Sequence, residues 1–93
     1  MDGLVGIIDD SELSLDILAE FLETEGLTVE TTSDELNAVA WAEKLRPDLL
    51  LVDLTLSRGS GELLVQELKK RSKLPSPVVI YSAHELTYVA EAA

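Results

Sequence analysis

Hydrophobic and polar residues are arranged along the chain in patterns that are typical of strands and helices. Apolar residues run almost continuously through residues 4–10, 48–54 and 78–82, whereas apolar and polar residues alternate through residues 27–32. Runs of this length predict strands, and the three continuous runs predict strands that are buried on both faces.

The segment after the first predicted strand has apolar residues spaced by three and four. This spacing predicts a helix that Asp10 or Ser11 caps at its start and that Gly26 stops, since glycine is favoured just past a helix end. The positions on its apolar side are Leu15, Leu18 and Leu22, with Ile17 and Phe21 beside them.

Similar spacing predicts further helices between the later strands. Ser33 or Asp34 is expected to cap a second helix, which Pro47 ends. Residues 62–71 predict a third helix, and residues 84–92 predict the start of a fourth. The apolar positions of the second helix are Leu36, Val39, Ala40 and Leu45.

Strands and helices therefore alternate four times, with short connections between them. This order predicts an α/β fold, a doubly wound parallel sheet with helices on both faces, in one domain over residues 1–93.

Charge is distributed unevenly over the 93 residues, whose net charge is −11. Residues 1–43 hold twelve acidic residues and no Lys or Arg. Because phosphate neutralisation needs a basic face, we expect no direct nucleic-acid partner. An acidic flank can attract a basic partner or a cation, or serve as a solvated face that aids solubility. Neither a signal peptide nor a membrane span is evident, and the lack of cysteine favours the cytoplasm.

Acidic residues interrupt the apolar runs at the carboxyl ends of the predicted strands. Asp9 and Asp10 end the first run, and Asp53 lies at the end of the third. In open parallel sheets these ends meet at the edge where ligands bind. Carboxylates brought together there repel one another, and a hard divalent cation compensates them, which predicts a Mg²⁺ (or Mn²⁺) site.

These residues, with their spacing, resemble the receiver domain of two-component response regulators over residues 3–91. The matching features are the acidic pair, Gly26 sixteen residues after Asp10, Asp53 at the head of D-L-T-L-S-R-G-S-G, and Ser82-Ala83 after the fourth run. Ser57 departs from the family pattern, which usually has proline there.

The resemblance implies a flavodoxin-like sheet with strand order 2-1-3-4 and a phosphoacceptor role for Asp53. A histidine kinase or phosphotransfer domain would be the phosphoryl donor. The metal ligands would be Asp10, Asp53 and the Thr55 backbone carbonyl, with Asp9 acting mainly through a bound water. Ser82 would be the phosphate switch residue, and Ala83 would leave room for the phosphoryl group. On this interpretation the chain is a signalling phosphoacceptor and not an enzyme.

Three alternative functions differ from this prediction in one feature each. A receiver-like module that is never phosphorylated would act by protein–protein contact alone. A phosphatase of the haloacid dehalogenase kind usually has a second Asp two residues after its nucleophile, where this chain has Thr55. A nucleotide-binding enzyme usually has a Gly-rich loop after the first strand, which this sequence lacks.

The family pattern continues past the last residues of this sequence, with a fifth strand, a fifth helix and a Lys that contacts phosphate. No Lys or Arg follows Lys73 here, so we expect the fifth unit to be absent and the domain to be incomplete at its C-terminus. An uncovered fourth strand or sheet face would then favour self-association.

Overall fold

A computed structural model describes residues 3–53, 61–71 and 77–81 of the chain. The elements follow one another as strand and helix in turn, as the sequence predicts. In chain order they are β1 (Leu4–Ile8), α1 (Glu12–Thr24), β2 (Thr28–Thr32), α2 (Ala38–Leu45), β3 (Leu49–Asp53), α3 (Gly61–Arg71) and β4 (Val78–Tyr81).

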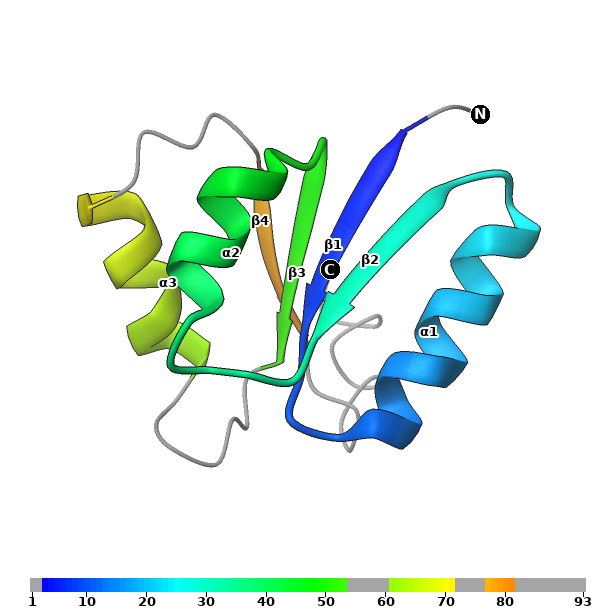
Figure 1. Ribbon diagram of the computed structural model, residues 1–93, viewed down its shortest axis with the longest axis horizontal. Coiled ribbons are helices and arrows are strands. Elements are labelled where there is room, and N and C mark those ends of the chain that lie inside the picture. Colours follow the sequence, from blue (N-terminus) through cyan, green and yellow to red (C-terminus); the bar gives the residue numbers. More distant parts are fainter. Residues whose placement is uncertain (1–2, 54–60, 72–76, 82–93) are drawn as a thin grey trace.

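The four strands form one sheet in the order β2-β1-β3-β4, and every neighbouring pair is parallel (Figure 1). Order and direction confirm the predicted doubly wound architecture. The strands are slightly shorter than predicted, since β1 ends at Ile8 and not at Asp10. The predicted helix over residues 84–92 and the end of the fourth strand at Ser82 lie outside the described residues.

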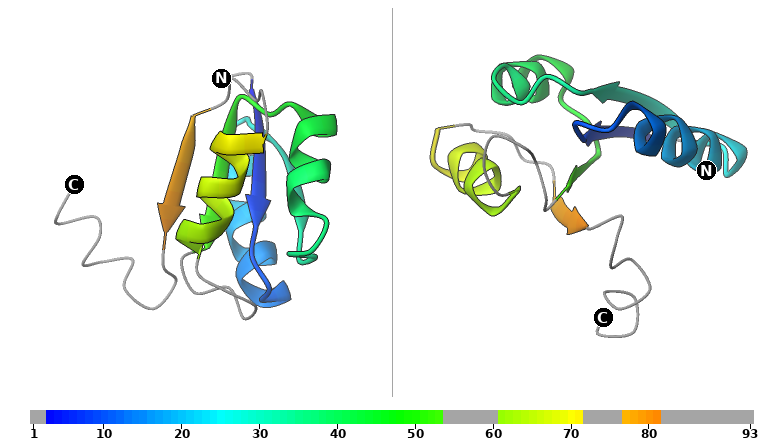
Figure 2. Two further views of the ribbon diagram at one scale, coloured as in Figure 1. Left: turned by 90° about the vertical axis from the view of Figure 1, so that its left-hand side faces the viewer. Right: turned by 90° about the horizontal axis from the view of Figure 1, so that it is seen from below.

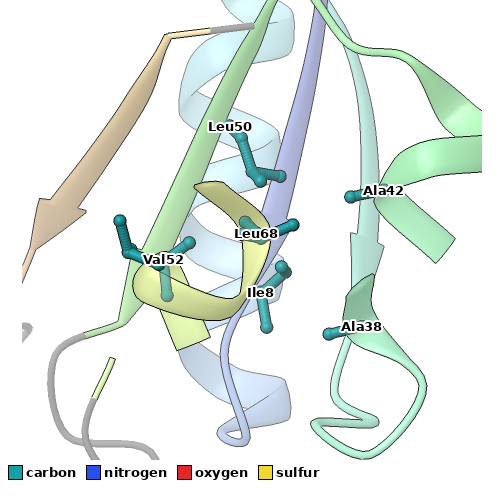
Figure 3. Packing of buried hydrophobic residues seen from close by; sticks show 7 residues of the cluster. Ile8, Ala38, Ala42, Leu50, Val52 and Leu68 are labelled. Atoms are coloured by element: carbon teal, nitrogen blue, oxygen red, sulfur yellow. The ribbon is translucent and has the colours of Figure 1, made fainter. Parts of the chain in front are cut away.

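The sheet separates two apolar clusters, because side chains alternate between the faces of a strand. Helices α2 and α3 cover one face, and α1 packs on the other (Figure 2). Figure 3 shows the first cluster, in which strand and helix side chains meet. Its buried members are Ile8, Ala38, Ala42, Leu50, Val52, Val65 and Leu68, and the second cluster contains Val5, Ile7, Leu15 and Tyr81.

Helix α2 approaches β1 closely at Gly6. A Cβ atom placed on this glycine would lie 3.1 Å from Leu50 Cδ1, 3.2 Å from Trp41 Cη2 and 3.3 Å from Leu45 Cδ2. These separations are tighter than ordinary van der Waals contacts, so the missing side chain is what lets the helix pack here. Trp41 accordingly has a packing role.

The ends of α1 confirm the predicted stop and decide between the two predicted caps. The Ser11 hydroxyl accepts a hydrogen bond from the Ser14 N–H, 3.3 Å away, so Ser11 and not Asp10 is the capping residue. Gly26 has φ 89°, the left-handed conformation that glycine adopts readily at a helix end.

The predicted start of the second helix is wrong. Neither Ser33 nor Asp34 caps α2, which begins at Ala38 after Asn37. The Asp34 carboxylate instead accepts hydrogen bonds from the Leu36 N–H at 3.1 Å and the Asn37 N–H at 3.4 Å. This local turn competes with the helix, and it leaves Leu36, which was predicted to be on the apolar face, 71 % exposed. The helix ends at Leu45, before Pro47, as predicted.

Three large apolar side chains of α1, namely Leu13, Ile17 and Phe21, are exposed at a spacing of four residues. At the other side of the described sheet, β4 pairs only with β3. Self-association through an uncovered fourth strand or sheet face stays a prediction. Among the described residues, no helix is long and apolar enough to cross a membrane.

Candidate functional site

Three carboxylates converge at the carboxyl edge of the sheet. Asp9 and Asp10 follow β1, Asp53 ends β3, and one oxygen of each lies within 4.8 Å of the others. Asp9 and Asp53 are buried, at 1 % and 4 % exposed, whereas Asp10 is exposed. The structure therefore brings together the three side chains that the sequence predicts for a metal site.

Strand register explains why these residues meet. Ile8 of β1 pairs with Val52 of β3, and Asp53 pairs with Tyr81 of β4. Asp9 follows Ile8, so Asp9, Asp53 and Tyr81 form one row across three strands. Because side chains alternate along a strand, the row belongs to the face that α1 covers.

Asp9 is held through both of its carboxylate oxygens. The Ser11 N–H donates to Oδ1 over 2.9 Å, and the Tyr81 hydroxyl donates to Oδ2 over 2.5 Å. Burial raises the pKa of the Tyr81 hydroxyl far above its ordinary value of 10.0, and its hydrogen bond to Asp9 and the nearby negative charges raise this pKa further. The phenol is therefore a protonated donor at neutral pH.

Tyr81 is a residue of the site that the sequence pattern does not reveal. Its position in an apolar run suggests only packing, and Tyr81 does pack with Val5, Ile7 and Leu15. The feature that could have indicated a role in the site is its phenol hydroxyl, since a buried Tyr hydroxyl usually has a hydrogen-bond partner.

The remaining predicted site residues, Thr55, Ser82 and Ala83, lie outside the described residues. Their predicted roles at the metal and the phosphoryl group are untested by the structure. Asp53 immediately precedes the first of these segments, and Tyr81 precedes the second.

The described residues fit a hard divalent cation. The cluster offers oxygen ligands only, from three carboxylates, and two of them are buried beside each other. Mg²⁺ and Mn²⁺ prefer such ligands, and a cation offsets the repulsion that the cluster creates. The same edge of a parallel sheet is where doubly wound proteins bind their ligands.

Comparisons with known proteins agree with this architecture. The family model of the response regulator receiver domain matches residues 5–93. The chain is 32 % identical over 84 residues to the polar-differentiation response regulator DivK of Brucella anthropi, covering 89 % of this chain and 68 % of DivK. It is 31 % identical over 75 residues to the regulatory protein VanRc of Enterococcus gallinarum, covering 81 % of this chain but 32 % of VanRc.

A solved structure shows the same fold. The chemotaxis response regulator CheY4 of Vibrio cholerae superposes with a TM-score of 0.77 at 26 % identity, covering 87 % of this chain and 68 % of that chain. The present chain thus spans about a third of VanRc and about two thirds of DivK. The parallel sheet, the acidic cluster at its carboxyl edge and the match over residues 5–93 place this chain in the response regulator receiver domain family.

Proposed function

We propose that this protein is a phosphoacceptor of a two-component phosphorelay, which takes a phosphoryl group onto Asp53 in the presence of Mg²⁺ or Mn²⁺. The observation that carries the proposal is the convergence of three carboxylates, with Asp53 among them at the open end of β3. The proposed receiver domain extends over residues 1–93.

The transfer makes one covalent bond to the protein, at Asp53. An Asp53 carboxylate oxygen attacks the phosphorus of a phosphohistidine on the donor protein and forms a P–O bond. The P–N bond breaks, its electron pair returns to the imidazole, and a proton from solvent restores the neutral ring. Asp53 becomes an aspartyl phosphate, an intermediate type known for carboxylate nucleophiles.

Asp10 and Asp53 would hold the metal directly, together with the Thr55 carbonyl, and Asp9 would act through a bound water. When bound, the cation offsets negative charge on the phosphoryl oxygens, which matters because phosphoryl transfer depends mainly on positioning and electrostatics. Ser82 would donate a hydrogen bond to the phosphoryl group, and Ala83 would leave space for it.

The donor would be a histidine kinase or a phosphotransfer domain, acting in the cytoplasm. The acidic first half of the chain supports a protein partner with a basic surface and argues against direct contact with nucleic acid.

The test is phosphorylation by a small phosphodonor, followed by intact-mass spectrometry. Wild type incubated with acetyl phosphate and Mg²⁺ is expected to gain the mass of one phosphoryl group, and Asp53→Asn is expected to gain none. Asp16→Asn is the matched control, because it removes one exposed carboxylate from α1 outside the cluster. A phosphorylated histidine kinase then replaces acetyl phosphate as the donor.

Two outcomes would contradict the proposal. If wild type gains no mass with either donor, and beryllofluoride with Mg²⁺ produces no spectral change, the unphosphorylated interaction module is the better interpretation. If Asp53→Asn gains mass as readily as wild type, Asp53 is not the phosphoacceptor.

A further inference from the structure

Tyr81 connects the last described strand to the Asp9 carboxylate, which directly follows the first strand. Strands β1 and β4 are not neighbours, because β3 lies between them. Backbones two strands apart in a sheet are separated by roughly 10 Å, so only a long side chain bridges them. Tyr81 does so beneath α1, and its hydroxyl oxygen lies 2.5 Å from Asp9 Oδ2.

This hydrogen bond fixes the Asp9 side chain. One carboxylate oxygen accepts from the Ser11 N–H at the start of α1, and the other accepts from Tyr81. Each contact comes from a different element, so rotation of the carboxylate would break both. Asp9 is 1 % exposed, so water has little access to replace a lost donor.

We propose that Tyr81 is a positioning residue for the divalent metal, acting by holding Asp9 in the orientation that the site requires. This inference rests on the metal site proposed above and goes beyond it by assigning a role to a residue outside the ligand set. Donors that hold a metal-site carboxylate commonly change metal affinity by about tenfold to a hundredfold when they are removed.

The position of Tyr81 in the chain gives the contact a second consequence. Tyr81 immediately precedes Ser82, the residue proposed to contact the phosphoryl group. The same hydrogen bond that fixes Asp9 therefore also holds the carboxyl end of β4 at Tyr81.

The experiment is a double-mutant cycle on Mg²⁺ affinity, measured by isothermal titration calorimetry. Tyr81→Phe keeps the ring in the apolar cluster and removes the donor. We expect it to raise the Kd for Mg²⁺ by about tenfold or more. In an Asp9→Asn background the same change is expected to alter Kd by less than about twofold, because coupled residues are not additive. Thr24→Val is the matched control, since it removes a hydroxyl bonded to the Phe21 carbonyl, away from the cluster, and should leave Kd unchanged.

A second measurement needs no variant. Wild type is labelled with ¹³C at the tyrosine Cζ atom, and its NMR spectrum is recorded during a Mg²⁺ titration. The Tyr81 signal is expected to shift, and the Kd obtained from that shift should equal the Kd from calorimetry. This readout reports on the Asp9 contact even if Tyr81→Phe fails to fold.

The outcomes separate this inference from the proposed function. If the Kd for Mg²⁺ of Tyr81→Phe lies within about twofold of the wild-type value, the positioning role is wrong while the metal site stands. The same conclusion follows if Tyr81→Phe raises Kd equally in the Asp9→Asn background, or if the ¹³C signal of Tyr81 does not shift when Mg²⁺ is added. Wild type that binds no Mg²⁺ contradicts the metal site itself, and the positioning role with it.

Discussion

Removing one charge from the acidic cluster is expected to stabilise the metal-free protein. The replacement Asp53→Asn keeps the size and shape of a side chain that is 4 % exposed and removes its charge. In the unfolded chain Asp53 is far from Asp9 and Asp10, so the repulsion between Asp53 and this pair destabilises only the native state.

The distances in the cluster set the magnitude. The carboxylate oxygens of the buried pair Asp9 and Asp53 lie within 4.8 Å of each other, so at an effective dielectric constant of about 20 their charges repel by about 3.5 kcal/mol or more. Asp10 is exposed, so its repulsion from Asp53 is nearer the value in bulk water, about 0.9 kcal/mol. Asp53→Asn removes this repulsion, but an amide accepts hydrogen bonds less strongly than a carboxylate. We therefore expect a net stabilisation of the folded state of about 2 kcal/mol.

Urea unfolding of both proteins in EDTA at low ionic strength measures this difference. Adding Mg²⁺ at ten times its Kd should stabilise wild type by about 1.4 kcal/mol, because the ligand binds only the folded state. The same addition of Mg²⁺ should stabilise Asp53→Asn much less, so the difference in the free energy of unfolding between the two proteins should become smaller. The control Asp16→Asn changes the net charge equally and should shift stability by less than about 0.5 kcal/mol. An Asp53→Asn protein that is no more stable than wild type in EDTA would refute the reasoning.

Three further predictions concern other parts of the fold. Gly6→Ala should lose about 1–3 kcal/mol in urea unfolding through overpacking, whereas Gly3→Ala, whose nearest contact would be 3.4 Å, should lose far less. Arg46→Gly should raise the melting temperature by relieving a left-handed residue at φ 52°, a gain of up to about 1 kcal/mol; an unchanged or lower value would contradict it. The pKa of Tyr81 is raised in the folded state. The stability that its hydroxyl contributes is therefore complete below pH 10 and is lost as pH rises further, since only the unfolded phenol ionises. Wild type in EDTA should therefore lose more stability above pH 10 than Tyr81→Phe, and parallel curves would show that this pKa is not raised.

The architecture was predictable because burial on both faces leaves a clear pattern in the sequence. Short runs such as Leu49–Val52, which follows Pro47, favour buried strands over helices. The carboxylates that end them fall at one edge once the strands are parallel. The three-carboxylate cluster follows from that geometry, so it too was predictable.

Two details were not predictable, for different physical reasons. The start of α2 depends on a local competition, in which the Asp34 side chain bonds N–H groups in a turn before the helix begins. The role of Tyr81 depends on register across three strands. Sequence spacing within one strand does not reveal which residue two strands away a long side chain will reach.

The hydrogen bond between Tyr81 and Asp9 joins residues 72 positions apart, which makes it a contact of very high sequence separation. Closing the intervening chain costs conformational entropy, so contacts of this kind slow folding. The site is completed only when β4 has docked on β3. Because a metal that binds the complete site stabilises the state in which β4 is docked, hydrogen exchange of the β4 backbone amides should slow when Mg²⁺ is added.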